Sequence, residues 1–435
     1  LTDPATIEAK FLRLVKAVSI PDEDVLDFDN SVFGVSNNQL LREIIGYVPV
    51  EPDGSVRAIV PANVPLMFDI VNSEGKRINI ENPNISLRHE NWLHLAPGAT
   101  LSCRGCHANN SIAPHGRLDA QTPSVHDGAS ATLPYPNTEP GLWSPNGGET
   151  MAQLFTLYNG IAARTPSVDL IYDDVWTDDS GALSKAPSFT NSYEALNTTA
   201  PTTTVATAGL NACTVSWDEK CRITINYPDH IQSIWELSRT PVDDGTGTMI
   251  DSCVGCHNSN MRVPAGQLDL TSSTSDIDAD HFTSYRELLQ NDGERVDNMG
   301  TIGERLWECN QIDPNDPNLP LYDIDGITPL RENRTPNAVV PASMSVAGAN
   351  FGASQFFFNC LTLDNNNIND NICRSFVGDT LPAAFPDECV EIAGDPVPDT
   401  FAINHNGMLT AEELRLIAEW LDIGAQYYNN PFAAP

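Results

Sequence analysis

The chain has 435 residues, and its 58 acidic side chains outnumber 23 basic ones to give a net charge of −35. A chain of this length forms about two to four domains, and its charge excludes nucleic acid and anionic membrane surfaces, which would repel it. No apolar run approaches the roughly 18 residues that cross a bilayer, so no transmembrane segment is expected.

Residues 1–88 are predicted to form a β-sandwich-like domain after one opening helix. The helix is expected over Ile7–Val18, where the apolar residues of FLRLV recur at helical spacing. From Tyr47 on, short Val- and Ile-rich runs are broken at the turn dipeptides Asp53-Gly54 and Glu74-Gly75. Prolines interrupt these runs as they do at strand ends.

Two mainly α, loop-rich domains are expected after this unit, at 89–205 and 206–435. The boundary lies in NTTAPTTTVATAGL at 197–210, a linker-like stretch with few large apolar groups. The last domain carries a long insertion at roughly 310–400, rich in Pro and Asn and without periodicity. The fold class is thus multidomain, with one β unit followed by two helical units.

Four segments of these two domains are predicted helices. They are GETMAQLFTLYNGI, YPDHIQSIWELSR, DADHFTSYRELLQ and the terminal LTAEELRLIAEWLDIG. The last is the best marked, because Thr410 and Glu413 form a capping box and Gly424 stands where the helix should end.

Two copies of Cys-x-x-Cys-His predict the chemistry of the chain. Two thiols three positions apart each add to one vinyl group of a haem, and the following histidine presents its imidazole to the iron. Chance occurrence of one such pentad in this composition is about 0.005. The attachment residues are Cys103, Cys106, Cys253 and Cys256, and the proximal iron ligands are His107 and His257. The sequence therefore predicts two covalently bound c-type haems.

A zinc site made from both cysteine pairs is the alternative, because thiolate pairs at this spacing also bind zinc. A histidine follows each pair directly and the pairs lie 150 residues apart, which favours two separate haem units. The motifs also open an internal repeat, in which CRGCHANNSIAPHGRLD and CVGCHNSNMRVPAGQLD align without gaps. We expect a backbone carbonyl near the proline to accept the Nδ1 proton of the proximal imidazole, and the leucine to pack against the haem.

The flanks of the second motif, HIQSIW and PAGQLDL, and the terminal LTAEELRLIAEWLDIGAQ resemble small bacterial cytochrome c domains. The longer order, VPVEPDGSVRAIVPANVPLMFDI, then NWLHLAPGATLSCRGCH, then a second haem domain, resembles the C-terminal part of the hydrazine synthase α-subunit and its wider relatives. This resemblance implies the same architecture and cofactor. In that family a Tyr four residues after the first motif's His takes part in binding the catalytic iron, whereas this chain has Ser111 there.

The second axial ligand of each haem decides whether it transfers electrons or binds a substrate. For the second haem we expect His405, because it lies just before the capped terminal helix, where small cytochrome c domains bring their distal ligand over the ring. The resemblance implies two His ligands there as well. Met408, Met344 and His281 are the alternatives. Two His ligands give a lower potential than His with Met.

The first haem has two candidate distal ligands of equal standing, His89 and His115. His89 comes from the segment before the motif, and His115 follows the motif closely but has Ala265 as its equivalent in the repeat. His94 and His126 are further candidates. An open first haem is the remaining alternative.

The six other cysteines predict an oxidising compartment. Cys213 with Cys221, and Cys360 with Cys373, flank short segments, which leaves Cys309 for Cys389, although six cysteines allow 15 connectivities. Disulfides form in secreted proteins, and c-type haem is attached in the same compartments. The expected location is therefore periplasmic or extracellular.

These observations favour a dihaem cytochrome that passes electrons between its two irons and onward to redox partner proteins. The second hypothesis is a haem enzyme whose open first haem acts on a small nitrogen or peroxide species. The third is a structural cytochrome that self-assembles into a complex or filament. The carboxylates of 313–326 are a candidate for Ca²⁺, although they lack EF-hand spacing and also fit a solvated loop.

Overall fold

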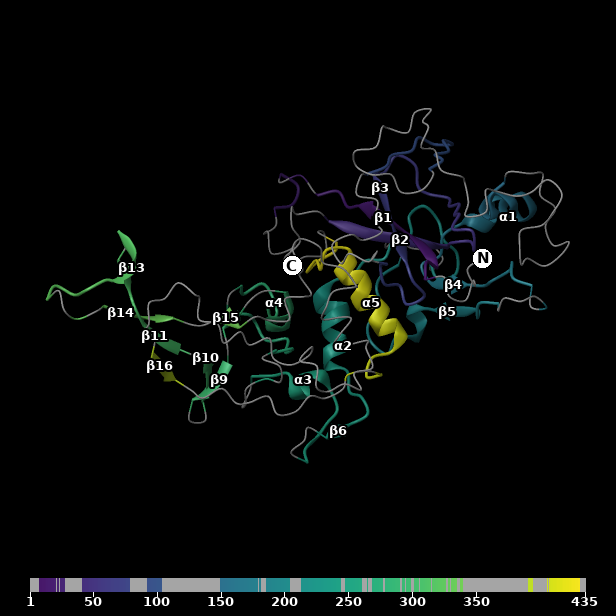
Figure 1. Ribbon diagram of the computed structural model, residues 1–435. Coiled ribbons are helices and arrows are strands. Elements are labelled where there is room, and N and C mark those ends of the chain that lie inside the picture. The colour runs from purple at the N-terminus through teal and green to yellow at the C-terminus, as the bar shows by residue number, and fades with distance from the viewer. Residues whose placement is uncertain are drawn as a thin grey trace.

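The structure is a computed structural model (Figure 1). Apart from isolated residues, it describes 8–20, 22–27 without 23, 41–78, 92–103, 149–178, 185–203, 213–243, 247–259, 268–289 without 277, 292–338 with short gaps, 390–393, and 405–430 without 406.

A three-stranded antiparallel sheet forms the N-terminal part, in the order β2-β1-β3. Its strands are β1 Phe11–Ala17, β2 Arg42–Pro49 and β3 Leu66–Val71. The central strand β1 pairs with β2 along its whole length, with a register shift between Leu14 and Val15, and with β3 over most of it. The antiparallel β structure predicted for this part of the chain is confirmed.

The opening helix predicted over Ile7–Val18 is wrong, because Phe11–Ala17 is a strand. Phe11 and Val15 face one hydrophobic cluster, whereas Leu12 and Leu14 face a second one. A strand with both faces buried is apolar at consecutive positions, and such a short run has the same composition as a buried helical segment. Pairing with β2 and β3, which are distant in sequence, selects the strand.

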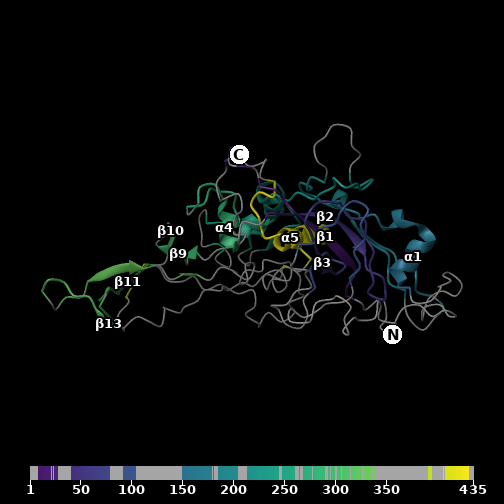
Figure 2. The ribbon, with the colours of Figure 1, turned by 90° about the horizontal axis from the view of Figure 1, so that it is seen from above.

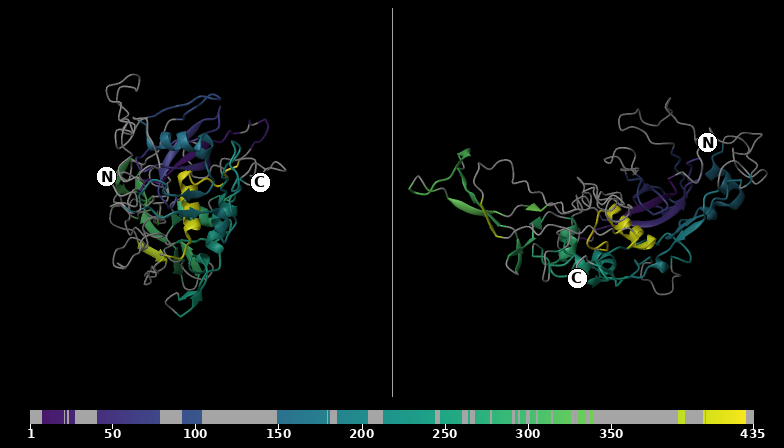
Figure 3. Two further views of the ribbon diagram at one scale, coloured as in Figure 1. Left: turned by 90° about the vertical axis from the view of Figure 1, so that its right-hand side faces the viewer. Right: turned by 60° about the horizontal axis from the view of Figure 1, so that its bottom comes forward.

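The layer that packs on the Phe11 face of the sheet combines a two-stranded ribbon with the terminal helix. The ribbon consists of β4 Leu170–Tyr172 and β5 Phe189–Asn191. The ring of Phe11 makes edge contacts with Tyr172 and Phe189, at centroid distances of 6.2 and 5.9 Å. α5, Ala411–Asp422, lies beside the sheet in the three ribbon views (Figures 1, 2 and 3). This layer takes the place of the second sheet expected for a sandwich.

The four predicted helices all contain helical structure. They contain α1 Met151–Asn159, α2 Gln232–Glu236 after a π-helical turn at Tyr227–Ile231, α4 Thr283–Leu289, and α5, whereas the single turn α3 Cys253–Cys256 lies outside them. Capping boxes define the N-termini of two helices. Thr150 and Gln153 form the box of α1, and Thr410 and Glu413 form the box of α5. The predicted box at Thr410 is confirmed.

From Arg415 on, the helix α5 is buried on all sides, including the face that carries its charged residues. Ile417, Trp420 and Leu421 are fully buried in the main cluster. Arg415, Glu419 and Asp422 on the polar face are at most 1% exposed, because they face the sheet and β4–β5 region rather than water. The guanidinium of Arg415, for example, donates to the carbonyl of Asn191 over 2.7 Å.

One hydrophobic cluster draws side chains from all three predicted domains. Phe11 of β1, Leu170 of β4 and Trp420 of α5 all belong to it, and so does Ile234 of α2. The N-terminal sheet and the segments around the second motif therefore share a core, whereas the domain boundaries at 88 and 205 stay predictions.

The remaining strands are short antiparallel pairs. They are β6 Val242–Asp243 with β7 Met249–Ile250, β8 Asp292–Gly293 with β15 Asn337–Ala338, β9 Arg295–Asn298 with β10 Thr301–Glu304, β12 Ile312–Asp313 with β13 Asp316–Pro320, and β11 Leu306–Asn310 between β14 Arg331–Arg334 and β16 Val390–Ala393. The strands of 295–334, drawn in green, extend away from the body of the molecule (Figures 1 and 2). Much of the insertion predicted at 310–400 lies outside the described residues.

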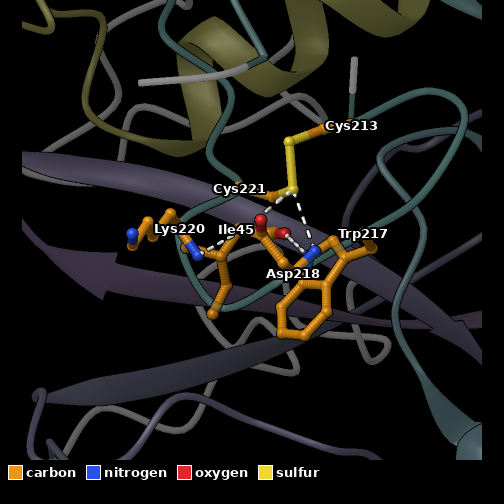
Figure 4. The surroundings of a disulfide bond; sticks show 6 residues. All are labelled: Ile45, Cys213, Trp217, Asp218, Lys220 and Cys221. Atoms are coloured by element: carbon orange, nitrogen blue, oxygen red, sulfur yellow. Dashed lines mark hydrogen bonds between the residues drawn. A yellow bond between two sulfur atoms is a disulfide. The ribbon is translucent and has the colours of Figure 1, made fainter. Parts of the chain in front are cut away.

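The predicted disulfide between Cys213 and Cys221 is present, and it closes a loop against the sheet (Figure 4). Trp217 in this loop donates its indole N–H to the carbonyl of Ile45 in β2 over 2.6 Å. The next residue of β2, Gly46, has a φ of +152°, and a Cβ there would lie 2.8 Å from the side chain of Pro166. The disulfide thus fixes a loop that packs closely on a strand. Cys360, Cys373 and Cys389 lie outside the described residues.

No helix in the described part of the chain is long and apolar enough to cross a membrane.

Candidate haem-binding site

The second Cys-x-x-Cys-His motif lies on the single helical turn α3. The N–H of His257 donates to the carbonyl of Cys253 over 2.9 Å and closes the turn. Residues three apart share a helix face, so both thiols of α3 lie on one side. Cys253 and Cys256 are partly buried free thiols, not joined in a disulfide. The turn is therefore compatible with attachment of both thiols to one ligand.

The glycine inside this motif allows a close approach of the preceding strand. A Cβ at Gly255 would lie 2.2 Å from Cγ2 of Ile250 in β7. The β-branched Ile250 side chain has little rotational freedom to move away. A larger residue at position 255 would therefore push β7 away from α3, and the first motif also has glycine, Gly105, at this position.

Asp269, near the end of the repeat, closes the loop that follows His257. Its carboxylate accepts the N–H of Ser259 over 3.0 Å and the N–H of Thr271 over 2.9 Å. The N–H of Leu270 donates to the carbonyl of His257 over 2.9 Å. The signal for this role in the sequence is the equivalence of Asp119 and Asp269 in the repeat, which by itself does not indicate what the carboxylate binds.

Leu268 is buried in the main cluster with 4% exposure. The predicted bond from the imidazole Nδ1 to a carbonyl near Pro264 concerns a loop of which 261–263 and 265–267 lie outside the described residues. It stays a prediction.

His405 faces His257. Their ring centroids are 6.1 Å apart, and the ring planes are inclined by 35°. Two imidazoles on opposite sides of one metal ion, each with its nitrogen about 2 Å from the metal, have ring centres roughly 6 Å apart. The two histidines therefore have the separation that a shared iron requires, and the thiols of α3 adjoin one of them. The residues present fit a c-type haem with two His ligands.

A tight turn carries His405 into the start of α5. The N–H of Met408 donates to the carbonyl of His405 over 3.1 Å. Gly407 inside this turn has a φ of +79°, which glycine adopts without a steric cost. Thr410 then caps α5. The position of His405 is thus tied to the first turn of a buried helix.

Arg239 joins the two halves of this site. Its guanidinium donates to both carboxylate oxygens of Glu413 and to the carbonyl of Met408, each over 3.0 Å. It also donates to the carbonyl of Ile234 within α2 over 3.0 Å. No local pattern in the sequence marks Arg239, because its partners are 169 and 174 residues away.

Burial controls the protonation of the site. It lowers the pKa of His405 below its ordinary value, so the imidazole is held neutral with a lone pair available to a metal. Burial also raises the pKa of the Cys253 thiol, and the positive charge of Arg239 opposes this shift. Without a bound ligand, burial therefore favours the neutral imidazole of His405 and the neutral thiol of Cys253 over their charged forms.

Of the alternatives for the second distal ligand, His281 packs in the aromatic core, Met408 lies in the same turn as His405, and Met344 is outside the described residues. His281 is 3% exposed, and its ring packs on Tyr427 at a centroid distance of 4.4 Å, with Asp278 3.2 Å from its Nδ1. Met408 offers its backbone to Arg239, and Met344 lies outside the described residues. The assignment of His405 stays a prediction that this geometry supports.

The first motif is described only at its first residue. Cys103 is exposed and a free thiol, and His94 is exposed as well. The other residues predicted there, namely Cys106, His107, His89, His115 and His126, lie outside the described residues. The ligands of the first haem therefore stay predictions.

Within the part of the chain that the structure describes, no group of three or more His, Cys, Asp or Glu side chains is placed to hold a metal ion. The zinc alternative involves residues beyond that part, as do the side chains of Asp313 and Asp316 in the Ca²⁺ candidate at 313–326, so both stay untested.

Comparison with known families relates the N-terminal segment to one of them. Residues 8–108 match the family model of the hydrazine synthase alpha subunit middle domain. The matched segment contains the sheet β2-β1-β3 and ends just after the first Cys-x-x-Cys-His motif. This part of the chain is therefore related to the hydrazine synthase alpha subunit.

Among solved structures, the chain is similar to Kuenenia stuttgartiensis hydrazine synthase, with 16% sequence identity and a TM-score of 0.42. The similarity covers 99% of this chain and 41% of that chain, so this chain spans about two fifths of its length. No curated protein matches the chain.

Proposed function

We propose that this protein is a c-type cytochrome with two covalently attached haems that transfers electrons. The observation that carries the proposal is the pair His257 and His405, whose rings lie 6.1 Å apart beside the two free thiols of α3. A haem with imidazoles on both sides has no open position for a substrate, which favours electron transfer over catalysis at that iron.

Each group of the site has a distinct role in this proposal. Cys253 and Cys256 attach the haem, His257 and His405 ligate the iron, and the surrounding apolar core sets the dielectric. The bound haem supplies the one-electron chemistry, and the chain controls its potential through ligands and burial. The same roles at Cys103, Cys106 and His107 follow from the repeat.

The proposed compartment is the periplasm or the extracellular space. The disulfide Cys213–Cys221 supports an oxidising environment (Figure 4). The net charge of −35 favours redox partners that present a basic face, because opposite charges steer their encounter.

A second candidate function is catalysis at the first haem, with the second haem as its electron source. The observation that favours it is the family match, which extends through Cys103–His107 and bears the name of a synthase. Ser111 stands where the resemblance has a tyrosine at the catalytic iron, so we propose no hydrazine-forming activity. The substrate in this case would be a small nitrogen or peroxide species at an open sixth position of the first iron.

Three measurements test the proposal. Denatured protein should retain haem stain and the mass of two haems, and low-temperature EPR should show two low-spin ferric signals. In His405→Ala the signal of the second haem should become high-spin, while the haem stain of the denatured protein persists. A first haem that is high-spin in the unmodified protein and binds added ligands would support the enzyme instead. Absence of covalent haem would overturn both functions.

A further inference from the structure

We propose that Arg239 is a positioning residue that holds His405 at coordination distance from His257. This inference rests on the proposed function, because it concerns the sixth ligand of the second haem. Arg239 does not itself ligate the iron in this proposal; it acts through the turn that carries His405.

The backbone of Arg239 is tied to the segment that enters the Cys-x-x-Cys turn. Its N–H donates to the carbonyl of Asp251, and the hydroxyl of Ser238 donates to the carboxylate of Asp251 over 2.5 Å. Asp251 lies two residues before Cys253. The main chain of Arg239 therefore moves with the half of the site that carries the attachment residues and His257.

The side chain of Arg239 is tied to the other half. It donates to the carbonyl of Met408, whose own N–H donates to the carbonyl of His405. It also donates with both terminal nitrogens to Glu413 in the first turn of α5, in a fork arrangement over 3.0 Å each. One residue thus links the two segments that must keep a fixed separation for both imidazoles to reach one iron.

The pair of Arg239 with Glu413 is largely buried, which makes the link stiff. Glu413 is 0% exposed and the side chain of Arg239 is 14% exposed. A buried carboxylate needs a counter-charge with good geometry, and a guanidinium offers two terminal nitrogens that each donate both to the carboxylate and to a further carbonyl, Met408 for one and Ile234 for the other. Lysine carries the charge but not the fork, so it cannot hold Glu413, Met408 and Ile234 together.

Glu413 has a second role that makes a clean test possible. Its carboxylate also accepts the N–H of Thr410 in the capping box over 2.9 Å. Glutamine serves this box as well as glutamate does. Glu413→Gln therefore keeps the start of α5 while it weakens the charged fork to Arg239.

The experiment compares Arg239→Gln, Arg239→Lys and Glu413→Gln in the full-length protein loaded with haem. We expect each to retain the mass of two haems and to lose low-spin EPR signal from the second haem, with the largest loss in Arg239→Gln. Added imidazole should restore the low-spin signal, because it fills the vacated sixth position. Restoration by a free ligand would not follow from general unfolding.

Arg164→Gln is the matched control. Arg164 is likewise buried and paired with a glutamate, Glu51, but it lies beside α1 and Trp176 rather than at this site. It should lower thermal stability and leave both low-spin signals unchanged. Should Arg239→Gln fold poorly, Glu413→Gln and Arg239→Lys carry the test.

The positioning role is overturned when all three site variants keep the full low-spin signal of the second haem and the reduction potential of that haem. Failure of the proposed function has a different signature, because then the unmodified protein lacks two haems, or His405→Ala leaves the second signal unchanged.

Discussion

Arg13 of β1 donates to the carboxylate of Asp422 of α5 over 2.6 Å, across 409 residues of sequence and with both side chains fully buried. Asp69 of β3 accepts from the same guanidinium over 2.8 Å. The pair joins the N-terminal sheet to the helix that follows His405. Because neither charge reaches water, the sheet and α5 need one another to fold.

Asp422→Asn should therefore destabilise the protein by about 3–5 kcal/mol, since it leaves part of the buried positive charge of Arg13 without its partner. The measurement is unfolding in guanidinium chloride, followed by circular dichroism and by haem absorbance. Both signals should change in one shared transition. The control is Glu74→Gln: Glu74 is 54% exposed where it pairs with Lys76, so a loss of about 1 kcal/mol or less is expected. Two separate transitions in the unmodified protein would show that the sheet folds independently.

The free energy of unfolding should fall in acid, because the native protein holds His230 neutral. Burial lowers the pKa of His230 despite the nearby charge of Asp229, and its Nδ1 accepts the N–H of Asn226 over 2.8 Å. The unfolded chain takes up this proton as the pH falls through about 6.5, whereas the native state takes it up only at lower pH. The contribution of neutral His230 is therefore complete above that pH and is lost below it.

His230→Asn tests this contribution, because the amide oxygen accepts the same N–H and does not titrate in this range. Free energies of unfolding for both proteins are compared between about pH 5 and pH 8. The difference in free energy of unfolding between the unmodified protein and His230→Asn should narrow as the pH falls. A gap that stays constant with pH would contradict the assignment of this acid sensitivity to His230.

Gly255→Ala should impair covalent attachment at the second motif. The added methyl would meet Ile250 at 2.2 Å, and overpacking of this kind costs about 1–3 kcal/mol. The expected result is a fraction of protein with the mass of one haem only. Ile250→Ala removes the opposing atom, so the double variant should recover attachment relative to Gly255→Ala. Equal loss in the single and double variants would mean that the glycine serves another purpose.

The disulfide Cys213–Cys221 should contribute about 2–3 kcal/mol, as expected for a short closed loop. The variant with serine at both positions is compared with Val215→Ser, which alters an exposed side chain of the same loop. Thermal melting without reductant should show a clear loss for the first and almost none for the second. Equal melting temperatures would indicate that Trp217 alone holds the loop on β2.

The sequence by itself determined the features whose cause lies within a few residues. The thiols and imidazole of Cys253–His257, the capping box at Thr410 and the small disulfide are set by neighbours in the chain, because a helical turn or a short loop brings those groups together wherever the segment lies. The predicted capping box and the predicted disulfide agree with the structure for that reason.

Only the tertiary structure decided the features that depend on distant partners. The stretch Phe11–Ala17 became a strand through pairing with β2 and β3, and the charged face of α5 became buried because Arg13, Tyr47 and Asn191 receive it. The same holds for His405 opposite His257 and for Arg239 between them. No local spacing encodes these contacts, since burial of a side chain depends on what the rest of the chain packs against it.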